Sequence, residues 1–230
     1  MPYIYLIVSV FMNASSSVFG KIFNKKNDDK KDSTIFYNFL LMISVFIGWG
    51  ILYLTDITFD VSVLWYSVLF ALCYVSCNLG IINALKYGPA MLTSLFISLS
   101  LILTTLWGFF FWDAKVTVFV VIGLILVICA IVLCLYTKEK DEKSFSWKWL
   151  FYVVLACLGN AGCSIVQRTQ QIKFNGQHGN MLMLFAIGIC ALAYLIIYLT
   201  SDKADTPIML KTSWWEPVCA GICNLVLNVF

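Results

Sequence analysis

Uncharged polar side chains recur at helical spacing inside apolar stretches, and they are the residues of this chain best suited to contact a solute. Asn13, Ser16 and Ser17 follow an i, i+3, i+4 pattern and therefore share one face of a helix. An amide in hydrocarbon raises the free energy unless it is hydrogen-bonded or faces water. We therefore predict a mid-membrane cavity lined by these side chains and by polar residues of other helices, namely Tyr74, Asn78, Ser98, Asn160, Ser164 and Asn224.

The alternative interpretation is structural. Small residues such as serine and cysteine let membrane helices approach closely, and asparagine forms hydrogen bonds between helices. The pattern alone leaves both interpretations open.

Catalytic and metal chemistry is not indicated by the sequence. The one histidine, His178, falls in a predicted loop, and no apolar stretch holds a pair of carboxylates, a nucleophile motif or a phosphate-binding loop. Cys73/Cys77 and Cys219/Cys223 each share a helical face, and four thiolates can bind zinc, but thiols also serve as small apolar packing residues. We expect no enzyme activity, no metal site and no cofactor.

The composition places the chain in a membrane. Of 230 residues, 61% are hydrophobic and 12% are charged, whereas a soluble domain carries about 25% charged residues. Lipid offers the backbone no hydrogen-bond partner, so each apolar stretch should be a helix. The sequence thus predicts an all-α polytopic membrane protein with about eight transmembrane helices, at approximately 3–20, 34–55, 62–86, 89–112, 116–136, 149–167, 180–200 and 214–230.

Charged and aromatic residues gather near the ends of these spans. The first seven spans have no Asp, Glu, Lys or Arg in mid-span, and we expect Arg168 and Glu216 to reach the interface from near helix ends. Most tryptophans lie near span ends too, as interfacial anchors do; they are Trp49, Trp65, Trp107, Trp112, Trp147, Trp149, Trp214 and Trp215.

Three segments recur in register. The matching pairs are 13–17 with 160–164, 53–55 with 198–200, and 73–79 with 219–225, at separations of 145 to 147 residues. We predict a first five-helix repeat at 1–137, a charged inter-repeat loop at 138–148, and a second, truncated repeat of three helices at 149–230. Five is odd, so the two repeats would be inverted relative to each other.

The repeat also indicates how long the full protein is. Residue 230 corresponds to about residue 84, so the second repeat lacks two helices by this alignment. We therefore expect the sequence to be a fragment of a ten-helix protein, an expectation that a stop codon directly after Phe230 would refute.

Several motifs resemble the drug/metabolite transporter superfamily, in particular its EamA-type ten-helix members. They are the segment Ala84-Leu85-Lys86-Tyr87-Gly88-Pro89-Ala90 before a fourth span dotted with serine and threonine, and the segments 112–117 and 122–124. The resemblance implies two five-helix repeats and transport. Such members usually have Gly-Glu where this chain has Asp113-Ala114. Small relatives depend on a glutamate in their first helix, where this chain has Asn13, so proton antiport through such a carboxylate is not expected.

Orientation is predicted differently by two arguments. Twelve of the 15 Lys and Arg residues fall in the odd-numbered loops and three in the even-numbered ones. The positive-inside rule then places the N-terminus outside. The family resemblance implies an N-terminus inside.

These observations favour a multi-pass plasma-membrane transporter that moves a small organic solute, for example in metabolite export, by alternating access. One alternative is a membrane scaffold or assembly partner of transporter ancestry without transport activity, and a second is an intramembrane enzyme. The expected partners are the solute and the lipid bilayer, with a homodimer left open. No nucleic acid is expected, because the basic residues lie in short loops beside acids.

Overall fold

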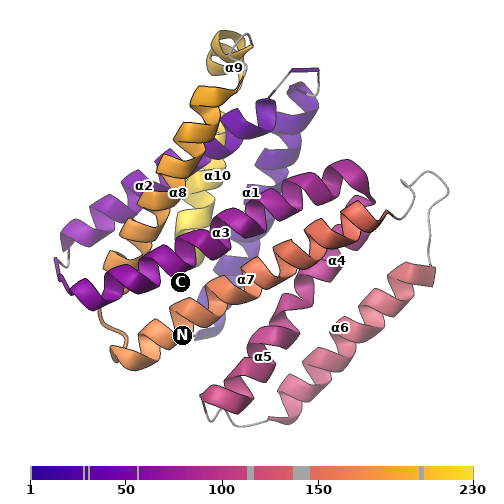
Figure 1. Cartoon of the computed structure of the whole chain (residues 1–230), viewed down its shortest axis with the longest axis vertical. Coiled ribbons are helices and arrows are strands. Elements are labelled where there is room, and N and C mark those ends of the chain that lie inside the picture. The colour runs from indigo at the N-terminus through magenta and orange to yellow at the C-terminus, as the bar shows by residue number, and fades with distance from the viewer. Residues whose placement is uncertain are drawn as a thin grey trace. The chain divides into compact units, whose positions relative to one another are not determined.

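The computed structural model describes residues 2–27, 29–30, 32–55, 57–112, 117–136, 146–201 and 205–229. Regular structure in these ranges is helical, without strands. Figure 1 shows the helices α1 (Pro2–Lys26), α2 (Ser33–Thr55), α3 (Val61–Tyr87), α4 (Ala90–Ser98), α5 (Ser100–Phe111), α6 (Val118–Tyr136), α7 (Trp147–Lys173), α8 (Gly179–Thr200), α9 (Thr206–Thr212) and α10 (Trp215–Val229).

Five helical stretches are long and apolar enough to cross a membrane. They are Ser33–Thr55, Val61–Ala84, Leu92–Phe111, Trp147–Lys173 and Gly179–Thr200, and α10 is a shorter apolar helix. The predicted class, an all-α polytopic membrane protein, is therefore confirmed. The further crossings expected in α1, α6 and α10 stay predictions.

Helix boundaries follow the sequence prediction closely and differ at four places. The fourth predicted span is divided into α4 and α5 at Leu99, whose backbone is still helical (φ −61°, ψ −19°). Helices α1 and α7 extend beyond their predicted ends to Lys26 and Lys173, because charged residues end an apolar stretch without ending the helix. The short helix α9, with Pro207 in its first turn, was not predicted.

Part of the predicted chain organisation lies outside the described residues. Residues 138–145 of the predicted charged loop lie outside the described residues. Helix α7 begins at Trp147, which the prediction placed in the same loop. Asp113 and Ala114, where the resemblance locates a Gly-Glu pair in other members, are also outside the described residues.

The chain forms two compact units, which interleave the two halves of the sequence. One unit comprises residues 1–67 and 178–230, and the other comprises residues 68–177. The first unit therefore combines α1 and α2 with α8, α9 and α10, and the second combines most of α3 with α4 to α7. Each unit takes helices from both predicted repeats.

In the first unit, α10 packs against α1 and α2, and α2 also packs against α8 (Figure 1). Gly221 permits the close approach of α10 to α2, since a Cβ there would lie 3.1 Å from the carbonyl oxygen of Leu41. At one end of these helices, Phe23, Phe36 and Met209 form a buried cluster. This end of the unit is thus held by apolar packing.

In the second unit, α3 and α7 touch backbone to backbone. A Cβ at Gly80 would lie 2.8 Å from the amide nitrogen of Ala156, and one at Gly159 would lie 2.7 Å from the carbonyl oxygen of Cys73. Such distances leave no room for a side chain, and small residues are what membrane helices use to approach this closely. The α3–α7 contact therefore requires glycine at both positions.

Two of the tryptophans interpreted as anchors belong to the packed interior instead. Trp149 is 1% exposed and Trp49 is 5% exposed. The indole nitrogen of Trp149 donates to the Thr93 hydroxyl at 2.9 Å, and its ring meets Phe96 edge-on. The anchor interpretation is wrong for Trp149, because an indole near a span end can also turn inward where a buried hydroxyl is available. Trp65 and Trp147, by contrast, are largely exposed.

We predict that Gly159→Val destabilises the protein, whereas Gly123→Val does not. Both glycines are helical, but a Cβ at Gly123 meets nothing within 4 Å. The two variants share the same change in helix propensity from glycine to valine, so their difference isolates overpacking, which costs about 1–3 kcal/mol. Thermal unfolding in detergent should give a Tm for Gly159→Val roughly 3–10 °C below that of Gly123→Val. Equal Tm values would contradict the close α3–α7 contact.

Candidate solute-binding site

The nine residues predicted to line a cavity divide between the two units. The first unit contains Asn13, Ser16, Ser17 and Asn224, and the second contains Tyr74, Asn78, Ser98, Asn160 and Ser164. Each group is described within its own unit.

In the first unit, the polar residues lie on the neighbouring helices α1 and α10. The Ser16 hydroxyl donates to the carbonyl oxygen of Ala220 at 3.4 Å, a long bond that joins the two helices. Asn224 is half-buried, and its side-chain and main-chain oxygens accept from the amide of Asn228. Asn13 is exposed, and the side chain of Ser17 is outside the described part of the chain.

In the second unit, Asn160 is hydrogen-bonded to a neighbouring helix. Its amide nitrogen donates to the Ser100 hydroxyl at 2.7 Å, which ties α7 to α5. Ser100 is 2% exposed, so this is an interior polar contact of the kind that the structural alternative describes. The sequence analysis missed Ser100, because nothing local distinguishes it from the other hydroxyls of its span.

Three further predicted residues of the second unit bond to their own helices. Asn78 donates to the carbonyl oxygen of Tyr74 at 3.0 Å, and Ser164 donates to that of Asn160 at 3.3 Å. Ser98 likewise donates to the carbonyl oxygen four residues earlier, at 3.1 Å. These bonds lower the free energy of a polar group in an apolar setting and leave the side chain close to its helix.

Glu216 is the ionisable residue for which the sequence interpretation is wrong. It is fully buried, whereas we expected it to reach the interface. It lies in the first turn of α10, against the last turn of α1, where Lys26 forms an ion pair with it. The sequence analysis ended the first helix at residue 20 and so assigned Lys26 to a loop. Arg168 is exposed, in line with the expectation, and donates to Gln171.

The cysteines of α3 and α7 belong to the interface between these helices. The Cys73 sulfur would lie 2.7 Å from a Cβ at Gly162, and the Cys163 thiol donates to the carbonyl oxygen of Phe70 at 3.8 Å. The eight cysteines that the structure describes are free thiols. Their surroundings are those of packing residues.

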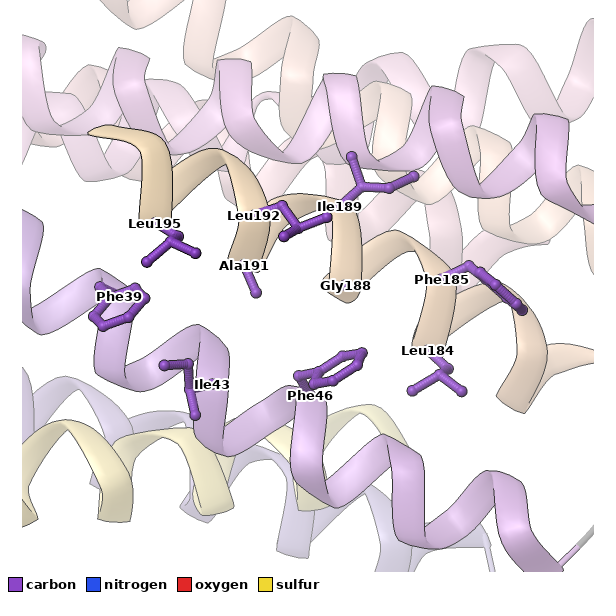
Figure 2. A pocket seen from close by; sticks show the side chains of 10 residues that line it. All are labelled: Phe39, Ile43, Phe46, Leu184, Phe185, Gly188, Ile189, Ala191, Leu192 and Leu195. Carbon is purple, nitrogen blue, oxygen red and sulfur yellow. The ribbon is translucent and has the colours of Figure 1, made fainter. Parts of the chain in front are cut away.

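A separate apolar groove of about 470 Å³ runs between α2 and α8 in the first unit. Figure 2 shows that side chains of both helices line it and that it contains none of the predicted polar residues. Its lining is Phe39, Ile43, Phe46, Leu184, Phe185, Gly188, Ile189, Ala191, Leu192 and Leu195. With no polar group to orient a solute, the groove is suited to hydrocarbon only.

The fold and the polar residues define a multi-pass helical membrane protein whose membrane segments carry uncharged polar groups. The chain belongs to the EamA-like transporter family, whose model matches residues 1–136, and hence to the drug/metabolite transporter superfamily. This confirms the resemblance drawn from the sequence. No match is found among curated proteins.

We predict that Asn160 and Ser100 are energetically coupled. Asn160→Ala and Ser100→Ala should each lower the free energy of unfolding by about 1 kcal/mol, and the double variant should lose little more than the larger single loss. Ser98→Ala is the matched control, because that hydroxyl bonds only within its own helix. Denaturant unfolding in detergent measures all four variants. Additive losses would show that the 2.7 Å contact does not stabilise the fold.

Proposed function

We propose that the protein transports a small organic solute across the plasma membrane by alternating access. Membership of a transporter family is the observation that carries this proposal. The helical membrane architecture supports it, since transporters of this kind bind solutes between helices near mid-membrane.

The uncharged polar residues support a particular class of solute. Asn160, Asn78 and Asn224 offer amide groups, and no Asp, Glu, Lys or Arg occurs among the nine proposed lining residues. Amides and hydroxyls bind through hydrogen bonds and give an ionic solute no counter-charge. The solute would therefore be neutral, zwitterionic or amphipathic.

Two helix contacts with matching donor positions support an architecture of two related repeats. Ser16 and Cys163 occupy matching positions, and each donates to a backbone carbonyl of a neighbouring helix: Ser16 to Ala220 in α10, and Cys163 to Phe70 in α3. In the sequence alignment α1 matches α7, and α3 matches α10. The pair α1–α10 would then be the counterpart of the pair α7–α3.

Comparative metabolite profiling of cells with and without the intact gene identifies the solute, and proteoliposomes containing the full-length protein then test it. We expect protein-dependent exchange of a metabolite whose level changes in the cells. If no solute on a broad metabolite panel is exchanged, the transport proposal is wrong and the scaffold alternative is favoured.

The proposed lining is tested separately in the same proteoliposomes. Asn13→Leu/Asn160→Leu should lower transport about 30-fold, since each of the two amides contributes a hydrogen bond worth about 1 kcal/mol. Ser100→Ala is the control, because it removes the same interhelical bond as Asn160→Leu but keeps the Asn160 amide. If the double variant transports like the wild type, the lining is wrong while the transport function stands.

A further inference from the structure

A partly buried ion pair joins the C-terminal turn of α1 to the first turn of α10. The Lys26 ammonium lies 2.5 Å from Oε1 of Glu216. The Glu216 side chain is 0% exposed, whereas that of Lys26 is 46% exposed. The carboxylate is therefore fixed inside the first unit, and the ammonium can exchange between the carboxylate and water.

The second carboxylate oxygen has no compensating contact. Oε2 of Glu216 is buried without a hydrogen-bond partner among the described residues. Pro217 follows directly and, lacking an N–H, offers no donor at this point of the helix. Lys26 is thus the group that balances the charge of this carboxylate.

Aromatic side chains hold the ammonium beside the carboxylate. The Lys26 nitrogen lies 5.3 Å from the centroid of the Trp215 ring, and Phe19 meets the same ring edge-on at 5.9 Å. A cation over an indole face is favourable. Trp215 and Glu216 together give Lys26 a defined bound position.

Other ionisable groups on the neighbouring helices do not replace Lys26. On α1, Lys21 and Lys25 are exposed. Helix α2 has no Asp, Glu, Lys or Arg, and its Tyr37 hydroxyl lies level with Gly20, more than one turn from Lys26. Lys211 of α9 is exposed, and α10 itself adds the thiols of Cys219 and Cys223.

We propose that Lys26 and Glu216 form a proton-linked latch between α1 and α10. When Lys26 withdraws to water, Glu216 is left as a buried and unpaired carboxylate, which is strongly destabilising. The carboxylate then either becomes hydrated, which separates the helix ends, or takes a proton from the aqueous side and becomes a neutral acid. When the latch closes, Lys26 returns with its charge and Glu216 releases that proton to water.

A proton suits this position better than a metal ion. Hard cations such as Ca²⁺ need six or more oxygen ligands, whereas the described residues contain no group of three or more His, Cys, Asp or Glu that could hold a metal. A role for the latch in a transport cycle rests on the transport function proposed above. The existence of the latch does not rest on it.

Hydrogen exchange in lipid nanodiscs tests the latch without any solute. The amides of residues 219–222 report on it, because they bond to carbonyls in the first turn of α10. Exchange is measured at about pH 8 and about pH 5 and corrected for intrinsic rates, in the wild type, Glu216→Gln, Lys26→Met and the control Lys25→Met. Lys25 shares the last turn of α1 with Lys26 but is exposed.

The latch predicts a different pattern for each protein. In the wild type, the ion pair keeps exchange slow at both pH values, and Lys25→Met behaves in the same way. Glu216→Gln exchanges faster than the wild type at pH 8 and is insensitive to pH. Lys26→Met exchanges about tenfold faster or more at pH 8 and slows toward pH 5, because protonation neutralises the unpaired carboxylate.

Two outcomes would overturn the proposal. If Glu216→Gln and Lys26→Met exchange like the wild type at both pH values, the pair is no latch. If Lys26→Met exchanges fast at both pH values, opening is not linked to a proton. Proteoliposomes that transport nothing while the exchange pattern holds would refute the transport function and leave the latch intact.

Discussion

Polar groups in the membrane segments need partners within the protein or in a water-filled cavity, because hydrocarbon offers none. The chain meets this constraint mainly with local bonds: Asn78, Ser98 and Ser164 all donate to carbonyls one turn back in their own helices. Among the described residues, other polar contacts join different helices, for example Asn160 with Ser100 and Lys26 with Glu216. These contacts hold helices together by more than shape.

Close packing at glycine residues also holds helices together. In the second unit, Gly80 and Gly159 bring α3 and α7 into backbone contact, and in the first unit Gly221 does the same for α10 and α2. In both units a helix from the first half of the sequence meets a helix from the second half. In units built in this way, the packing of each half of the chain depends on helices of the other half.

The sequence predicted the helices well, because apolar length in a membrane protein leaves the backbone little choice of structure. It predicted side-chain surroundings poorly. The position of Trp149 near a span end is compatible with an indole that faces lipid and with one that faces Thr93. Only the fold shows that it faces Thr93. Ser100 could not be chosen over neighbouring hydroxyls without knowing that Asn160 packs beside it.

Glu216 shows the same limit for charge. A glutamate near the start of an apolar stretch is typical of an interfacial residue. Glu216 is buried instead, in a contact that depends on α1 continuing to Lys26. Hydropathy does not predict a helix end that extends past the apolar stretch, because charged residues such as Lys25 and Lys26 are typical of loops. The candidate lining residues remain a prediction for a related reason, because their role depends on a solute as well as on the fold.

Alternating access is tested most directly by the reactivity of cysteines at positions 13 and 160. Asn13→Cys and Asn160→Cys would be treated with a membrane-impermeant thiol reagent from either side of the membrane, with the native cysteines as background. Alternating access predicts that each introduced thiol reacts from both sides and that the transported solute slows both reactions. Reaction from one side alone, unaffected by the solute, would contradict it.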